Sequence, residues 1–133
     1  MYDPDPAGPP PAVLKLRLEP LLAAIAVDGT GVALRDLRPR DGDYAKVFRP
    51  AACERARERY ERLWSGPIDF RHPDPEARVE IDVVRAGESA TLVPGRAWAS
   101  WRYVVPGQTA GLSYDGLVWC DDHWAWFPKP HRL

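Results

Sequence analysis

Near the C-terminal end of the chain, four residue types that can do chemistry stand side by side. They are Cys120, Asp121, Asp122 and His123, within the stretch LVWCDDHWAWFPKP. A cysteine and a histidine can form a nucleophilic pair when a third group, here one of the two aspartates, orients the base. The same residue types bind zinc, but four neighbours on one turn cannot converge tetrahedrally, and no second pair of cysteine and histidine completes the set. We therefore expect no metal and no cofactor at this place.

The position of these residues favours a turn over a reactive site. They lie between two apolar segments, where aspartate-rich dipeptides serve hairpin turns because aspartate tolerates left-handed backbone conformations. A turn is open to solvent and offers no evident donors for an oxyanion. The remaining histidines, His72 in the proline-bounded stretch FRHPDPEA and His131 near the C-terminus, have no visible partner. The catalytic residues of the chain, if it has any, stay unknown from the sequence.

A second group of candidate site residues is aromatic. Tyr60 and Trp64 share one face of a predicted helix, and Trp101 and Tyr103 share one face of a predicted strand, so we expect the two pairs to meet. Either these residues fill a core, or some of them line a concave pocket for a small molecule. The sequence has six tryptophans that enter this choice: Trp64, Trp98, Trp101, Trp119, Trp124 and Trp126.

One carboxylate joins the aromatic candidates. Asp82 suits acid–base chemistry if its side of an alternating strand turns inward, away from water. The alternative is that it lies on the solvent side of that strand. The predicted ligand-binding residues are Tyr60, Trp64, Asp82, Trp101 and Tyr103.

The elements that must position these residues run helices first and strands second. The firmest helix covers residues 50–64, where apolar side chains recur on one face and arginines interleave with glutamates on the other. A further helix covers residues 19–27; residues 14–18 either extend it or form a short strand, because proline is tolerated in a first turn but not in a helix interior. Short helices are expected in residues 32–37 and, capped by Asp41, in residues 43–48.

Alternation of apolar and polar residues predicts the strands. We expect them at residues 77–87, 98–105, 110–119 and 123–127, with a short piece at residues 91–93. The second of these is apolar on both faces, which predicts a strand covered on both sides. Helices followed by strands with hairpin-length turns indicate an antiparallel meander with helices segregated to one face, an α+β domain at residues 13–133. Residues 1–12, with five prolines, are expected to be a disordered tail.

In its order of elements the chain resembles the cystatin-like cone fold. The pattern covers residues 13–130: N-terminal helices, a long amphipathic helix ending in LW, and a curved sheet of about four strands closing with DDHWAWFPKP. This is the superfamily named for nuclear transport factor two, which also holds polyketide-cyclase-like and ketosteroid-isomerase-like proteins. The resemblance implies a pocket between sheet and helices, and no family active-site residue carries over. The cluster of short helices in residues 30–48 departs from the pattern.

Composition narrows the classes of partner. The formal net charge of -1 gives no bulk attraction to nucleic acid, and no stretch reaches the ~20 apolar residues of a membrane span. Two cysteines are too few for a disulfide framework, and the acidic, proline-rich N-terminus is unlike a signal peptide, so we expect a cytoplasmic protein. Of 18 basic residues only three are lysine, which points to a GC-rich bacterial genome.

Three function classes stay open from the sequence. The first is binding of a small apolar molecule in a pocket between helices and sheet, without catalysis. The second is a protein-interaction or immunity-type module, with another protein or a second copy of the chain as partner. The third is a cone-fold enzyme that uses a cavity carboxylate or histidine.

Overall fold

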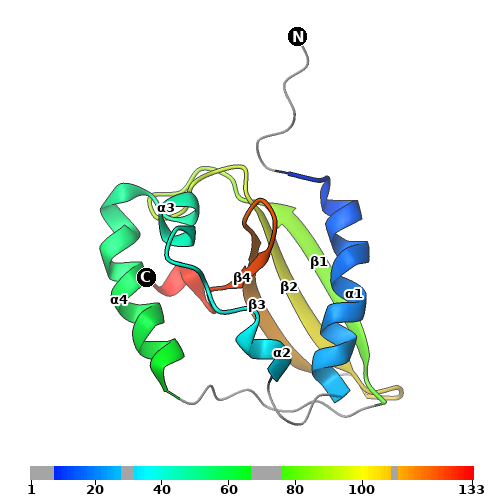
Figure 1. The fold of residues 1–133 in the computed structure, drawn as a ribbon. Coiled ribbons are helices and arrows are strands. Elements are labelled where there is room, and N and C mark those ends of the chain that lie inside the picture. The colour runs from blue at the N-terminus through cyan, green and yellow to red at the C-terminus, as the bar shows by residue number, and fades with distance from the viewer. Residues whose placement is uncertain (1–7, 28–31, 67–75, 109–110) are drawn as a thin grey trace.

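The structure is a computed structural model that describes residues 8–27, 32–66, 76–108 and 111–133. In this part of the chain, helices precede a four-stranded sheet, which confirms the α+β class (Figure 1). The helices are α1 (Pro11–Val27), α2 (Val32–Arg35), α3 (Asp43–Val47) and α4 (Pro50–Ser65), with a 3-10 helix η1 (Pro130–Arg132). The strands are β1 (Arg78–Arg85), β2 (Ala97–Val104), β3 (Leu112–Trp119) and β4 (Trp124–Trp126).

The sheet is an antiparallel meander in the order β1-β2-β3-β4. One irregularity interrupts it: the register between β2 and β3 shifts between Ala99 and Trp101, so that β3 has one residue more than β2 at this point. Such a bulge bends a strand and increases its twist. In β3 the extra length includes Gly116, whose backbone has φ +89°.

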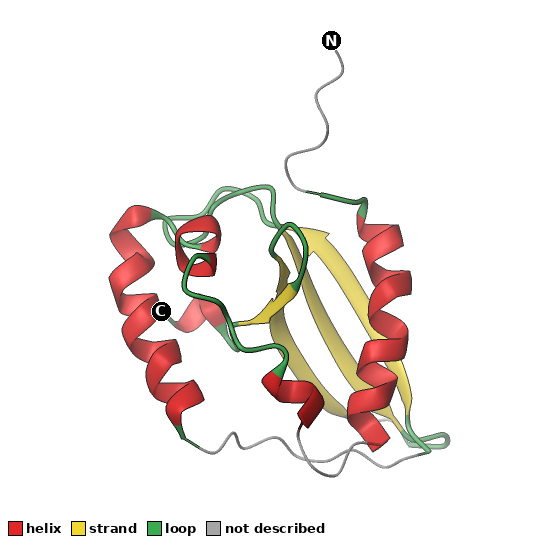
Figure 2. Ribbon diagram, viewed as in Figure 1, coloured by secondary structure: helices red, strands yellow, loops and turns green. Residues whose placement is uncertain are grey.

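Helix α1 covers one face of the sheet and packs along β1 (Figure 2). The hydroxyl group of Tyr103 donates a hydrogen bond of 2.8 Å to the Leu22 carbonyl oxygen, which ties β2 to this helix. Residues 14–18 belong to α1, so the strand alternative for them is wrong. Pro20 lies inside the helix, contrary to expectation; it and Leu16, four residues earlier, are on the exposed side, where a lost helical hydrogen bond costs least.

One part of the hydrophobic core lies among α3, α4 and the segment after β4. Its centre is Phe127, whose ring contacts those of Tyr44, Phe48 and Tyr60 at centroid distances of 5.4, 5.1 and 5.0 Å. All four side chains are buried. The predicted short strand at residues 91–93 is reduced to a single bridge between Phe48 and Leu92.

The cap of α3 and the start of α1 differ from what the sequence predicts. Asp41 does not cap α3; Gly42 is the N-cap residue and makes no side-chain cap bond, while Asp41 accepts a hydrogen bond from Arg57 on α4. Residues 11 and 12 form the first turn of α1, and a Cβ on Gly8 would come within 2.9 Å of the Trp119 ring. Residues 1–7 lie outside the described part of the chain, as does His72. No helix within the described ranges is long and apolar enough to cross a membrane.

Candidate functional site

The predicted aromatic residues lie in the interior. Tyr60 is fully buried, and its hydroxyl group donates a hydrogen bond of 2.9 Å to the Pro128 carbonyl oxygen. Trp64, one turn further along α4, packs edge-on against Trp126 with ring centroids 6.1 Å apart. Both side chains of α4 therefore contact the C-terminal segment.

The strand pair is also buried, and it meets the helix pair only through an intermediate. Trp101 is 3% exposed and packs against Trp126 at 6.1 Å, so Trp126 lies between Trp101 and Trp64. Tyr103 contacts Tyr114 and, through its hydroxyl group, α1. The four residues thus belong to one continuous core, but the direct contact between the two pairs is absent from the ring contacts of the described residues.

The other face of the sheet is open in its middle. Ser100 and Arg102 on β2 are exposed there, so the prediction that this strand is covered on both sides is wrong at these two positions. Asp82 lies opposite Ser100 in the register of β1 and β2, and its side chain is exposed. Asp82 therefore lies on the solvent side of its strand, the alternative that the sequence left open.

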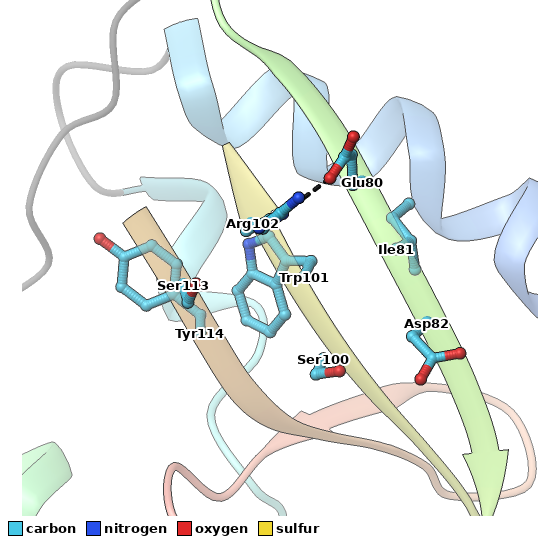
Figure 3. Close-up of a pocket in the computed structure, with 8 residues that line it drawn as sticks. All are labelled: Glu80, Ile81, Asp82, Ser100, Trp101, Arg102, Ser113 and Tyr114. Atoms are coloured by element: carbon cyan, nitrogen blue, oxygen red, sulfur yellow. Dashed lines mark hydrogen bonds and ion pairs between the residues drawn. The ribbon is translucent and has the colours of Figure 1, made fainter. Parts of the chain in front are cut away.

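A hollow of about 280 Å³ lies over this open patch (Figure 3). Its lining includes Asp82 and the edge of Trp101, two of the five predicted ligand-binding residues. At one end Arg102 donates a hydrogen bond of 2.7 Å to the Glu80 carboxylate, an ion pair drawn in Figure 3. This hydrogen bond from Arg102 is the main reason that the pKa of Glu80 lies below its usual value.

Two further hollows continue the first along the same face. One of about 310 Å³ is lined by Ser100, Asp115 and Lys129 among others, and one of about 280 Å³ by Ser100, Trp98 and Val84. Ser100 lines all three, so they form one strip, which we call the sheet-face groove. Tyr60, Trp64 and Tyr103 line none of the three hollows.

The CDDH stretch forms the predicted turn between β3 and β4. The Cys120 amide donates to the His123 carbonyl oxygen at 2.8 Å, and the Asp122 amide donates to the Cys120 carbonyl oxygen at 2.7 Å. Asp121 takes a left-handed conformation with φ 67°, which aspartate tolerates. Its carboxylate lies 2.7 Å from Arg96 and 3.2 Å from Lys46. Arg96 is the main cause that keeps the pKa of Asp121 low.

A residue that the sequence analysis did not consider completes this turn. Asp43, at the start of α3, is only 1% exposed, and its carboxylate oxygens lie 2.8 and 3.0 Å from Nε2 of His123. The carboxylate also accepts a hydrogen bond from the Arg40 amide at 2.8 Å. On the other side of the ring, Nδ1 of His123 lies 2.5 Å from the Asp122 carboxylate.

The hydrogen-bonding groups of this cluster limit where its protons can be. Ionised carboxylates only accept hydrogen bonds, so an imidazole between two of them donates from both nitrogens only as a cation; otherwise one carboxyl group carries the proton. The hydrogen bond from His123 is the main cause that lowers the pKa of Asp122. Asp122 is therefore ionised at neutral pH.

Cys120 is close to this pair but is unsuited to nucleophilic catalysis. Its side chain is fully buried, and burial, with a smaller contribution from the charge of Asp43, raises the pKa of its thiol to about 12. A thiol with such a pKa is protonated at neutral pH, whereas the thiolate is the nucleophile. The Cys–His nucleophile is thus disfavoured by the environment of the sulfur.

The cluster nevertheless brings three kinds of metal-ligating atoms together. A carboxylate oxygen of Asp43, Sγ of Cys120 and a ring nitrogen of His123 all lie within 4.8 Å of one another. Neighbours on one turn cannot surround an ion by themselves, but Asp43 adds a ligand from another element, α3. Only one signal in the sequence hints at Asp43: an aspartate within the apolar pattern of a short helix, and that signal equally fits a helix cap.

Comparison with known proteins adds no identification. No protein-family model, no curated protein and no solved structure matches the chain. The resemblance to the cone fold therefore depends on the order and packing of the elements, which are compatible with it.

Proposed function

We propose that this domain binds a small molecule, largely apolar and with one cationic end, in the sheet-face groove and without chemistry. The observation that carries the proposal is that three hollows meet at Ser100 and form one strip on the face of the sheet where Asp82, Ser100 and Arg102 are exposed, bordered at one end by η1. This places the ligand on the opposite face of the sheet from the pocket that the sequence analysis expected. An open groove with apolar walls and a few polar groups is typical of small-molecule sites.

The polar end of the groove favours a cation. Glu80 is engaged by Arg102 and lies 3.4 Å from Arg78, so its charge is compensated. Asp82, two residues along β1, has no ion pair or hydrogen bond within the described ranges, and its carboxylate lies beside Ser100. A ligand ammonium group is the complement of such a carboxylate.

The other end of the groove favours an apolar body. Its walls include Leu92, Trp98 and Val84, and Val84 is 56% exposed, unusual for a large aliphatic side chain. Covering exposed apolar surface stabilises a complex by roughly 25 cal/mol per Å². A ligand that extends from Asp82 past Ser100 to Val84 thus uses both ends of the groove.

The proposal is tested with two dyes that share one aromatic body. Dansylcadaverine ends in an amine and dansylglycine in a carboxylate, so their difference reports the charge preference. We expect the dansylcadaverine fluorescence to increase on binding. Asp82→Asn should weaken that binding by about 2- to 5-fold, the value of a solvent-exposed ion pair, without weakening dansylglycine.

The position of the site is tested by filling the groove. Ser100→Trp places a large side chain where the three hollows meet, and we expect it to abolish binding of both dyes. Ser65→Trp, on the exposed C-terminal end of α4, is the matched control and should bind like the parent. If the parent binds neither dye, or if Ser100→Trp binds as the parent does, the groove is not the site.

The second candidate function is a protein-interaction module that acts through α1. The side chain of Leu16 is 71% exposed and that of Val13, three residues earlier on the same face, is 38% exposed. Exposed apolar residues on one helix face are a feature of contact surfaces. If two copies of the chain pair through this face, sedimentation will detect a dimer that Leu16→Glu dissociates.

We further propose that the domain is a cone-fold protein of the cytoplasm. The packing of helices on one face of an antiparallel meander supports the first part. The second is supported by Cys53 and Cys120, which are both free thiols, as is usual in reducing compartments.

A further inference from the structure

We propose that Asp43, Cys120 and His123 bind a divalent transition-metal ion, and specifically Zn²⁺. This site shares no residue with the three hollows of the sheet-face groove, so it is independent of the function proposed above. Its ligands come from α3 and from the turn between β3 and β4, two segments about 80 positions apart in the sequence.

The distances fit an ion with small movements. Tetrahedral zinc with bonds of about 2.0–2.3 Å holds its ligand atoms roughly 3.3–3.6 Å apart. The three candidate atoms lie within 4.8 Å of one another, and Nε2 of His123 is 2.8 Å from the nearer Asp43 oxygen. Insertion of the ion therefore needs this nitrogen and oxygen to separate by about 0.5 Å, and a pair at the 4.8 Å limit to approach by about 1.2 Å. Three protein ligands leave a fourth position for water, as zinc sites with an open position do.

The ligand types select the metal. Sulfur, nitrogen and oxygen donors together suit zinc, whereas magnesium and calcium take oxygen ligands. Cys120 is fully buried and His123 nearly so, with its side chain 12% exposed. The ion would lie among three mostly buried side chains, of which His123 is the most exposed.

Asp122 provides an independent indication. A histidine that binds a metal usually donates its other ring N–H to a carboxylate, which fixes the ring and the tautomer. His123 has this arrangement already: Nδ1 lies 2.5 Å from the Asp122 carboxylate, while Nε2 is directed toward Asp43. The ring is therefore oriented with the ligating nitrogen inward.

The buried charge gives a reason for cation binding. The Asp43 carboxylate is almost wholly removed from water, which is costly without a compensating positive charge. In the metal-free cluster the carboxylate has only the Arg40 amide and Nε2 of His123 within hydrogen-bond distance. A zinc ion at this place supplies the positive charge, and its binding displaces the Cys120 thiol proton to solvent, so that the sulfur binds as the thiolate.

The test uses metal-free protein and cobalt as a spectroscopic substitute for zinc. We expect one Zn²⁺ per chain in competition with a chromophoric chelator. We also expect Co²⁺ to produce a near-ultraviolet sulfur-to-metal charge-transfer band. Cys120→Ser should remove the band, and His123→Gln should weaken Zn²⁺ binding strongly. Asp122→Asn, which touches no ion, should weaken it by about 10- to 100-fold.

The other cysteine provides the matched control. Cys53 lies half-buried on α4, outside the cluster, so Cys53→Ser should keep both the band and the affinity. Circular dichroism of each metal-free variant separates loss of binding from loss of fold. The proposal is overturned if the parent takes up no Zn²⁺ or if the charge-transfer band survives in Cys120→Ser. It is equally overturned if the band depends on Cys53.

Discussion

Trp101 offers the most direct measurement of how the core is built. Its side chain lies on the face of β2 that is turned toward α1 and is only 3% exposed. Its ring stacks on Tyr114 at 5.5 Å and contacts Trp126 at 6.1 Å. Trp101→Ala therefore removes a ring that packs against both β3, through Tyr114, and β4, through Trp126.

The expected loss of stability follows from that burial. Truncating a buried tryptophan to alanine costs about 3–5 kcal/mol. Each aromatic pair contributes a further ~0.5–1.5 kcal/mol beyond its buried area, so a residue with two such pairs belongs in the upper half of that range. We therefore expect Trp101→Ala to lower the free energy of unfolding by about 4 kcal/mol.

Urea denaturation measures this quantity. With an m value of about 2 kcal/mol per molar urea, the midpoint should decrease by about 2 M with little change in slope. Arg102→Ala, the next residue of β2, is the matched control: its side chain points to solvent, and its exposed ion pair with Glu80 is worth only about 0–1 kcal/mol. A loss below about 2 kcal/mol for Trp101→Ala would mean that the residue has open space beside it, as a pocket wall does, and the packed core described above would be wrong.

Three further outcomes are expected. Gly116→Ala should lower the free energy of unfolding, measured by urea denaturation, by more than about 2 kcal/mol, because the new Cβ would lie 2.1 Å from a backbone oxygen. Gly107→Ala is the control: its φ is similarly positive but the space around it is open, so it should lower the free energy of unfolding by only about 1–2 kcal/mol. Burial raises the pKa of Tyr103 to about 12, so the folded state binds this proton more tightly than the unfolded chain. The contribution of Tyr103 to stability should therefore be complete below about pH 10 and fall by about 1.4 kcal/mol per pH unit up to about pH 12. Burial also raises the pKa of Tyr44, Tyr60 and Cys120, so the measured quantity is the difference in slope between the parent and Tyr103→Phe. An unchanged slope in that variant would contradict the prediction. In alkylation at pH 8, Cys53 should react in the folded protein and Cys120 only after unfolding, since its thiol is buried and its pKa is about 12; rapid loss of both thiols would refute the described environment.

The elements themselves could be predicted because their signals are local. The amphipathic spacing of residues 50–64 and the alternation in residues 77–87 depend only on neighbours a few positions apart, and both became the expected helix and strand. The hairpin at Cys120–His123 was likewise predictable, because the turn is made by its own aspartates. Where local signals competed, as at Pro20, the sequence left the start of the helix open, and the structure decides for the longer helix: packing of α1 on the sheet outweighs the preference of one residue.

The contents of the sites were decided by the tertiary structure. Spacing in the sequence brought Tyr60 and Trp64 to one helix face, but only packing inserted Trp126 between that face and Trp101. The alternation of side chains along β2 shows that the strand has two faces, but it does not show which face the helices will cover. The open face at Ser100 is therefore set by where the helices pack. Asp43 and His123 meet across about 80 positions because α3 packs beside the turn between β3 and β4, and no pattern within either segment encodes that contact.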